Sequence, residues 1–176
     1  MAQPIKENAT RANAVPAGVA AGIVFAVMVV QAILRSIVGV FSTLTLSGGR
    51  GSFYPGDVFA PVGGFFTEFA TNILPVTIGV FAAFWLLVPL TSHLRVARVA
   101  LRSLVAAGVA ALLVLVFTSV YSGWGVIFGG GDFFYGVFGT VQSVLYTFIG
   151  VTPLVMLAGF LAWFWVSKGR PKASAL

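Results

Sequence analysis

The residues best suited to chemistry in this chain are a few charged side chains within long apolar stretches. Arg35 stands inside one run of hydrophobic residues, and Glu68 stands just before the next run. Gln31 precedes Arg35 by four residues, which places both side chains on one face of a helix. A guanidinium and a carboxylate at the edge of a membrane can pair, or the guanidinium can bind an anion outside. Gln31, Arg35 and Glu68 are therefore the candidate polar cluster.

The depth of Arg35 makes a partner important for this side chain. It stands about sixteen residues above the inner end of its apolar run, so at 1.5 Å per residue it lies about 24 Å up a core about 30 Å thick. A charge at such depth costs several kcal/mol unless it pairs or its long side chain reaches water. We expect Arg35 to pair with Glu68 near the outer boundary. The alternative is that Arg35 reaches water or lipid phosphate alone.

A second group of cations, Arg95, Arg98 and Arg102, follows the second apolar run. Their spacing puts them along one face if the next helix begins early, and we expect them to contact anionic lipid headgroups. His93 beside them is the only histidine of the chain. It is interpreted as a solvated loop residue rather than a pH sensor, and a single histidine excludes bis-histidine haem ligation within one chain.

The remaining residues indicate no catalysis, cofactor or metal. The chain has no cysteine, which excludes disulfides and thiolate metal sites. The glycine-rich stretches 48–51 and 129–131 lack the Lys and Ser/Thr of a phosphate-binding loop and are interpreted as turns. Asp57 and Asp132 are scattered and follow no spacing of paired catalytic acids. We expect no enzymatic activity, no cofactor and no bound metal.

The composition places these residues in a lipid bilayer. Hydrophobic residues make up 59% of the 176 residues and charged residues only 8%, against about 25% charged in soluble domains. The net charge of +6 comes from Lys and Arg near the ends of apolar runs, which indicates membrane insertion rather than nucleic-acid binding. An all-α integral membrane protein is predicted, with anionic headgroups on the cytoplasmic side as partners and no nucleic acid.

Four apolar runs are long enough to cross the membrane as helices. The first hairpin, 17–91, has a span at about 17–41, an outer loop at 42–63 and a returning span at about 64–91. Pro75 predicts a kink in the returning span, because membrane helices tolerate proline when neighbours satisfy the carbonyl that it leaves unpaired.

The second hairpin covers residues 99–166. Its spans lie at about 99–121 and 143–166 and are joined by an outer loop at 122–142. Three short segments are expected on the cytoplasmic side: the N-terminal segment 1–16, the linker 92–98 and the basic tail 167–176.

Small residues indicate where helices approach one another. Gly18 and Gly22 stand four residues apart, a spacing that lets two membrane helices come close. The pair is equally well explained by a seam of small residues within the chain.

The distribution of Lys and Arg sets the orientation. The N-terminal segment has two, the central connection three and the tail three, whereas the first outer loop has one and the second has none. Because cytoplasmic connections carry the excess of Lys and Arg, both termini are predicted in the cytoplasm. The excess of Ala, Val and Gly over Lys indicates a bacterial protein, so the expected location is the bacterial plasma membrane.

The two halves of the chain resemble each other at an offset of eighty residues. Roughly a quarter of the aligned positions are identical, including positions in the outer loops, where apolar composition does not explain the match. The clearest identities are Gly49, Gly51 and Phe53 with Gly129, Gly131 and Phe133, and Gly79, Phe84 and Trp85 with Gly159, Phe164 and Trp165. Both halves begin inside, so we predict two tandem-repeated hairpins with parallel pseudo-symmetry.

Two functions fit these features. The favoured one is a non-enzymatic scaffold or accessory subunit that contacts a protein partner or a second copy of the chain. The alternative is a small transporter or channel that uses the interface between the hairpins. A core of Ala, Gly and Val without a polar cavity would favour the scaffold, whereas a cavity reaching Gln31, Arg35, Glu68 or Thr152 would favour the transporter or channel.

Overall fold

The computed structural model describes residues 10–48, 55–91, 93–129 and 133–168, and these residues are all-helical. The elements, in chain order, are α2 (Arg11–Gly48), α3 (Pro55–Glu68), the π-helical turn η1 (Phe69–Ile73), α4 (Leu74–Ala82), the π-helical turn η2 (Ala83–Leu87), α5 (Val96–Gly129) and α6 (Phe133–Lys168). Four stretches are long and apolar enough to cross a membrane: Arg11–Thr45, Ala60–Leu87, Val96–Val120 and Val144–Lys168. The prediction of an all-α, multi-pass membrane protein is confirmed at this level.

The helices extend well beyond the apolar spans. The predicted outer loops at 42–63 and 122–142 are largely helical, because α2 continues to Gly48, α3 begins at Pro55, and α5 and α6 occupy most of the second loop. Helix α2 has 38 residues, which at 1.5 Å each gives about 57 Å, against a hydrocarbon core of about 30 Å.

Packing between α2 and α3 explains why helix replaces the first predicted loop. A Cβ on Gly39 would lie only 3.1 Å from Cβ of Pro61, and Ser36 Oγ donates to the Pro61 carbonyl at 3.4 Å. Gly and Pro were interpreted as turn signals, whereas here Gly39 allows the Pro61 ring to approach and Pro55 occupies the first helical position, where a missing N–H costs nothing.

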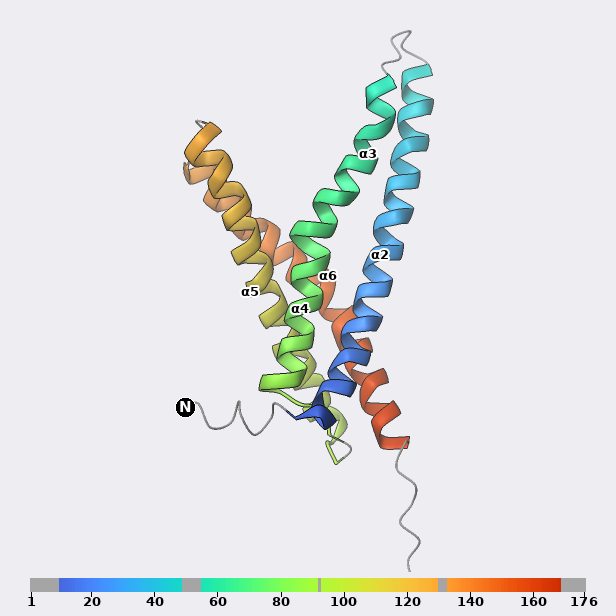
Figure 1. Cartoon of the computed structure of the whole chain (residues 1–176), viewed down its shortest axis with the longest axis vertical. Coiled ribbons are helices and arrows are strands. Elements are labelled where there is room, and N and C mark those ends of the chain that lie inside the picture. The colour runs from blue at the N-terminus through green and yellow to red at the C-terminus, as the bar shows by residue number, and fades with distance from the viewer. Residues whose placement is uncertain (1–9, 49–54, 92, 130–132, 169–176) are drawn as a thin grey trace, which may run out of the picture.

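Among the described residues, α2 contacts α3 and α4, and α5 contacts α6; these two groups of chain neighbours, called hairpins below, also contact each other. Helix α2 contacts α4 and also α6, and α5 contacts α4 and also α6, so each span has two neighbours. Figure 1 shows the hairpins converging at the end where α2 begins and diverging toward the opposite end, where α2 meets α3 and α5 meets α6.

Small side chains hold the converging half together. The buried residues there are mostly Ala and Val, including Ala17, Ala20, Val24, Val76, Val80, Ala106, Ala107, Ala110, Val155, Ala158 and Ala162. The closest backbone approach is at Gly79, where a Cβ would lie 2.5 Å from Cα of Ala110. At Gly159 a Cβ would collide with Ser103 Oγ and lie 3.2 Å from Cζ of Phe84.

Gly18 and Gly22, whose spacing suggested a close helix contact, do not make one. Both are exposed, and no atom lies within 4 Å of the position that a Cβ on either would occupy. The buried face of α2 runs instead through Ala17, Ala20 and Ala21, which share a helical face that the two glycines lie beside.

A π-helical turn interrupts the second span directly before Pro75. Proline has no N–H, and its ring clashes with the carbonyl four residues earlier. The wider turn accommodates this, and the Leu74 N–H donates to the Phe69 carbonyl, five residues earlier. The interruption predicted at Pro75 therefore takes the form of a π turn, a local feature that recurs at functional sites.

The first testable consequence concerns the contact at Gly79. Gly79→Ala is expected to lower the free energy of unfolding by about 1–3 kcal/mol, because the methyl group would force α4 away from α5. The measurement is thermal unfolding of the purified protein in non-ionic detergent. The control is Gly108→Ala in α5, where no atom lies within 4 Å of the added Cβ; it should leave the midpoint unchanged or raise it, since alanine favours helix by about 1 kcal/mol. Equal midpoints for the two variants would contradict the close approach.

Candidate functional site

A polar cavity lies where the two hairpins diverge. One lobe, of about 270 Å³, is lined by α2, the junction of α3 with η1, and α6. A second lobe, of about 480 Å³, is lined by the same junction together with α5 and α6. The two lobes share Glu68, Asn72 and Thr147 in their lining, so they are adjacent and are treated together as one cavity between the hairpins.

Helix α2 carries one wall of the smaller lobe. Its buried stripe includes Met28 and Ala32, which pack into the core. Gln31 and Arg35, four residues apart, lie beside that stripe and line the lobe together with Met28. The amphipathic order of the helix thus turns both polar side chains into the cavity and not deeper into the apolar core.

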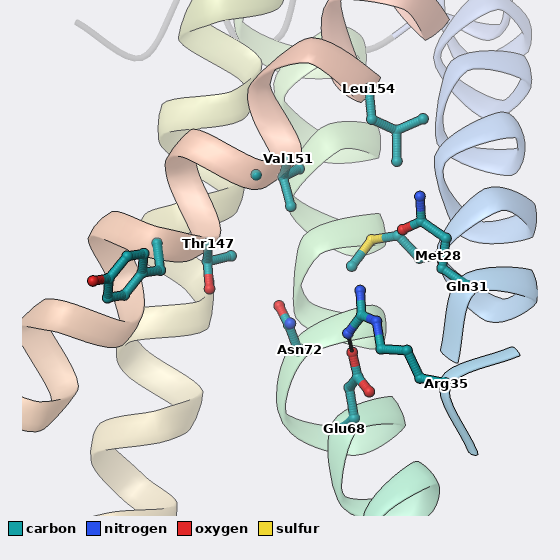
Figure 2. A pocket seen from close by; sticks show the side chains of 10 residues that line it. Met28, Gln31, Arg35, Glu68, Asn72, Thr147, Val151 and Leu154 are labelled. Atoms are coloured by element: carbon teal, nitrogen blue, oxygen red, sulfur yellow. Dashed lines mark hydrogen bonds and ion pairs between the residues drawn. The ribbon is translucent and has the colours of Figure 1, made fainter. Parts of the chain in front are cut away.

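The opposite wall carries the acidic partner. Arg35 Nη1 donates to Glu68 Oε1 at 2.6 Å, with 66% of the arginine side chain and 28% of the glutamate side chain exposed. Figure 2 shows the guanidinium reaching from α2 across to Glu68. The structure therefore brings together the two charges whose pairing we expected, and places Gln31 beside them in the same cavity.

Asn72, which sequence reasoning missed, lies on the same wall as Glu68. Its Oδ1 is buried and has no hydrogen-bond partner among the residues described. Asn72 is the last polar residue before the apolar run of the second span, and its position one turn after Glu68 was the signal that could have identified it. The cavity wall thus carries a carboxylate and, one helical turn further on, an amide whose oxygen is buried without a partner among the described residues.

Threonines complete the cavity wall, and two of them donate their hydroxyl protons to carbonyls of their own helix. Thr67 Oγ1 donates to the Gly63 carbonyl at 3.3 Å, and Thr71 Oγ1 donates to the Thr67 carbonyl at 2.8 Å. Both line the larger lobe with Thr118 and Thr147. Thr152, which we had considered as a cavity residue, is not among the residues lining either lobe and donates to the Phe148 carbonyl at 2.5 Å.

The arginines at the converging end do not form a uniform set. Arg95 and Arg98 are exposed, whereas Arg102 is half-buried and donates through Nη1 to the Pro89 carbonyl. That bond ties α5 to the segment following η2, where Pro89 follows directly after the last helical turn. Contact of Arg95, Arg98 and Arg102 with lipid headgroups stays a prediction.

The described part of the chain holds no group of three or more His, Cys, Asp or Glu side chains that could bind a metal ion. Asp132 and the side chain of Asp57 lie outside the described residues. What the cavity offers is one positive group, one negative group and several hydrogen-bonding groups, which suit the binding of a small polar molecule.

Comparisons with protein-family models, with curated proteins and with solved structures give no match. The role of the cavity is therefore inferred from its own residues.

The ion pair can be tested with a double-mutant cycle of Arg35→Gln and Glu68→Gln. Because both side chains are partly exposed, we expect a coupling free energy of about 0.2–1 kcal/mol. The measurement is the free energy of unfolding of the wild type, the two single variants and the double variant in mixed detergent micelles. A parallel cycle with Arg95→Gln in place of Arg35→Gln should show no coupling. Strict additivity in the first cycle would mean that the two charges do not interact.

Proposed function

We propose that this chain is a small transporter or channel that admits a polar solute to the cavity between its two hairpins. The observation that carries the proposal is the lobe of about 270 Å³ that Gln31, Arg35 and Glu68 line. Charged groups within membrane spans are costly, and they commonly mark a substrate or ion pathway. Transporter sites also lie at interfaces between repeated halves, and this cavity lies between the two hairpins that we propose to be a repeat.

The competing function is a non-enzymatic scaffold or accessory subunit. The converging half supports it, since Gly79 and Ala110 meet as closely as a rigid core requires. A scaffold role alone, however, does not explain why Arg35, Glu68 and the unpaired Asn72 oxygen lie beside an opening. If a protein partner or a second copy covered that opening, solutes would not reach it.

The proposed architecture includes the tandem repeat. The neighbours of the spans support it, because α2 lies beside α6 just as α5 lies beside α4, the pattern expected of two hairpins related by an axis along the membrane normal. Thr67 and Thr147, eighty residues apart, both line the larger lobe. The polar pair departs from the repeat, since Leu115 and Phe148 stand where Arg35 and Glu68 would recur.

We place the protein in a bacterial plasma membrane with both termini in the cytoplasm. Helix α2 begins and α6 ends at the same end of the bundle (Figure 1), and the exposed Arg95 and Arg98 precede the apolar part of α5. These cations would then contact anionic headgroups of the inner leaflet. The cavity would open toward the outer side.

Reporter fusions test this orientation. Green fluorescent protein fused after Thr91 or Leu176 is expected to fluoresce, because it folds in the cytoplasm, whereas alkaline phosphatase should be active after Gly48 or Gly129. A triple variant should weaken the preference for this orientation, because it removes the positive charges of the central connection. The variant combines Arg95→Gln, Arg98→Gln and Arg102→Gln. Activity of the phosphatase after Thr91 in the wild type would overturn the proposed topology.

Cysteine labelling tests whether the cavity admits solutes. The chain has no cysteine, so an introduced thiol reacts without background. Thr147→Cys, in both lobes of the cavity, is expected to react with a membrane-impermeant charged methanethiosulfonate added outside, because a reactive thiolate needs a polar environment. The matched control is Ile149→Cys, two residues along α6 and 67% exposed, which should face lipid and stay unreacted.

The pattern of labelling separates the two functions. Reaction at position 147 and not at 149 supports solute access to the cavity. An unreactive thiol at both positions would favour the scaffold, with the cavity covered by lipid or by a partner.

A further inference from the structure

We propose that the cavity binds a small zwitterion with a primary ammonium group. Arg35 binds its carboxylate or phosphate, and Glu68 and Asn72 bind its ammonium. This inference rests on the proposed function, because it names the ligand class of the same cavity. The chemistry has two possible sources, a free solute of the amino-acid type and the headgroup of a phosphatidylethanolamine lipid, and the experiment below distinguishes them.

The two walls of the smaller lobe offer complementary groups. From α2, Arg35 presents a guanidinium with five N–H donors, of which the contact to Glu68 Oε1 uses one nitrogen, Nη1. From the opposite wall, Glu68 presents its carboxylate, and the half-buried Asn72 side chain can turn its buried, unpartnered Oδ1 toward a ligand. Figure 2 shows Arg35 on one side and Glu68 and Asn72 on the other, with the lobe extending past them toward α6. A ligand with an anionic end and a donor end fits across these walls.

Electroneutrality favours a zwitterion over a simple ion. A lone anion at Arg35 would be repelled by Glu68, which lies 2.6 Å from the guanidinium, and a lone cation at Glu68 would be repelled by Arg35. Such repulsion acts at contact distance even between partly exposed groups, where water reduces it. A zwitterion places an opposite charge beside each member of the pair, so four charges alternate in sign and the net charge of the site does not change.

The unpaired oxygen of Asn72 specifies an N–H donor. A buried acceptor without a partner loses the hydrogen bonds it had in water, and a ligand donor restores one. Asn72 Oδ1 is such an acceptor among the described residues, on the wall that also holds Glu68. A primary ammonium has three N–H donors and can bind both groups, whereas a quaternary ammonium has none. The site should therefore discriminate between these two cations of equal charge.

The size of the lobe limits the ligand. Its volume of about 270 Å³ lies just below the range of about 300–1,000 Å³ that accommodates drug-sized molecules. The apolar residues Met28, Val151 and Leu154 line the rest of it and can cover a short methylene chain. Glycine, β-alanine and O-phosphoethanolamine have the charges, the N–H donors and the small size that the lobe requires.

Calorimetric titration of the full-length wild-type protein in non-ionic detergent tests the ligand class. The probes are glycine, β-alanine and O-phosphoethanolamine, and their matched analogues are acetate, methylammonium and trimethylglycine. We expect at least one of the three zwitterions to bind at least about tenfold more tightly than every analogue, which corresponds to about 1.4 kcal/mol. Acetate binding as tightly as the best zwitterion would show a simple anion site and overturn the proposal.

A variant with a selective readout connects this binding to Asn72. Asn72→Leu is expected to weaken the binding of the best primary-amine ligand about tenfold while leaving that of trimethylglycine unchanged, because trimethylglycine never donates to this residue. An unfolded variant would lose both equally and is thereby recognised. Arg95→Gln, far from the cavity, serves as the control and should bind as the wild type does. If Asn72→Leu still prefers the primary amine over trimethylglycine as strongly as the wild type does, the proposed role of Asn72 is overturned.

A second titration identifies the source of the ligand. Dihexanoyl phosphatidylethanolamine is compared with dihexanoyl phosphatidylcholine, which keeps both charges but has no N–H. Binding of the free solutes alone indicates a soluble ligand, and selective binding of the ethanolamine lipid alone indicates a headgroup. If neither binds, the proposal is overturned.

The two proposals can fail separately. If Thr147→Cys is labelled but no zwitterion binds, the proposal of a solute-accessible cavity is supported and the proposal of a zwitterionic ligand is contradicted. If the ethanolamine lipid binds selectively but Thr147→Cys is not labelled, the proposed ligand class is supported and the access of solutes from water is contradicted.

Discussion

The structure depends on close helix contacts at small residues in the half of the bundle where the hairpins converge. In lipid, apolar side chains gain little by leaving one apolar environment for another, so helix association depends on close packing. Gly79 against Ala110 and Gly159 against Ser103 provide that packing. In the diverging half, larger side chains such as Phe25, Phe65 and Phe69 pack beside the core. The hairpins diverge there, and the polar cavity lies at that transition.

The polar side chains of the spans divide into those that their own helix satisfies and those that it does not. Thr77 Oγ1 donates to the Ile73 carbonyl at 2.8 Å, and Thr152 makes the same bond to Phe148. Such residues are tolerated in a membrane helix without any partner helix. The charges of Arg35 and Glu68 cannot be satisfied by a carbonyl of their own helix, so the two side chains must pair within the first hairpin or reach water. Asn72 Oδ1 has no partner in the described part of the chain. Ser103 Oγ and Trp163 Nε1 are also buried without a partner among the described residues, but neither residue lines the cavity.

The sequence was sufficient for the features that follow from composition and depth, and insufficient for those that depend on packing. Apolar length predicted four spans, and the cost of a buried charge predicted that Arg35 would meet Glu68. The first outer loop was predicted from the Gly and Pro residues of the segment 48–72, whereas Pro61 in that segment packs against Gly39 of the neighbouring helix. For the same reason, the spacing of Gly18 and Gly22 gave no information about which helix face is buried. Only the neighbouring helix decides that.

The position of Glu68 shows why a regular helical period cannot place this site. At about 100° per residue, an uninterrupted helix would rotate Glu68 by about 80° away from Val76 and about 120° away from Val80, the buried residues of α4. The π turn at Phe69–Ile73 adds about one residue without adding helical rotation. Across it, Glu68 lies within about 20° of both valines. The turn that precedes Pro75 therefore also rotates Glu68 onto the face that meets the other helices, and Asn72 lies within the same turn. The backbone conformation before Pro75 thus determines which side chains of the second span line the cavity.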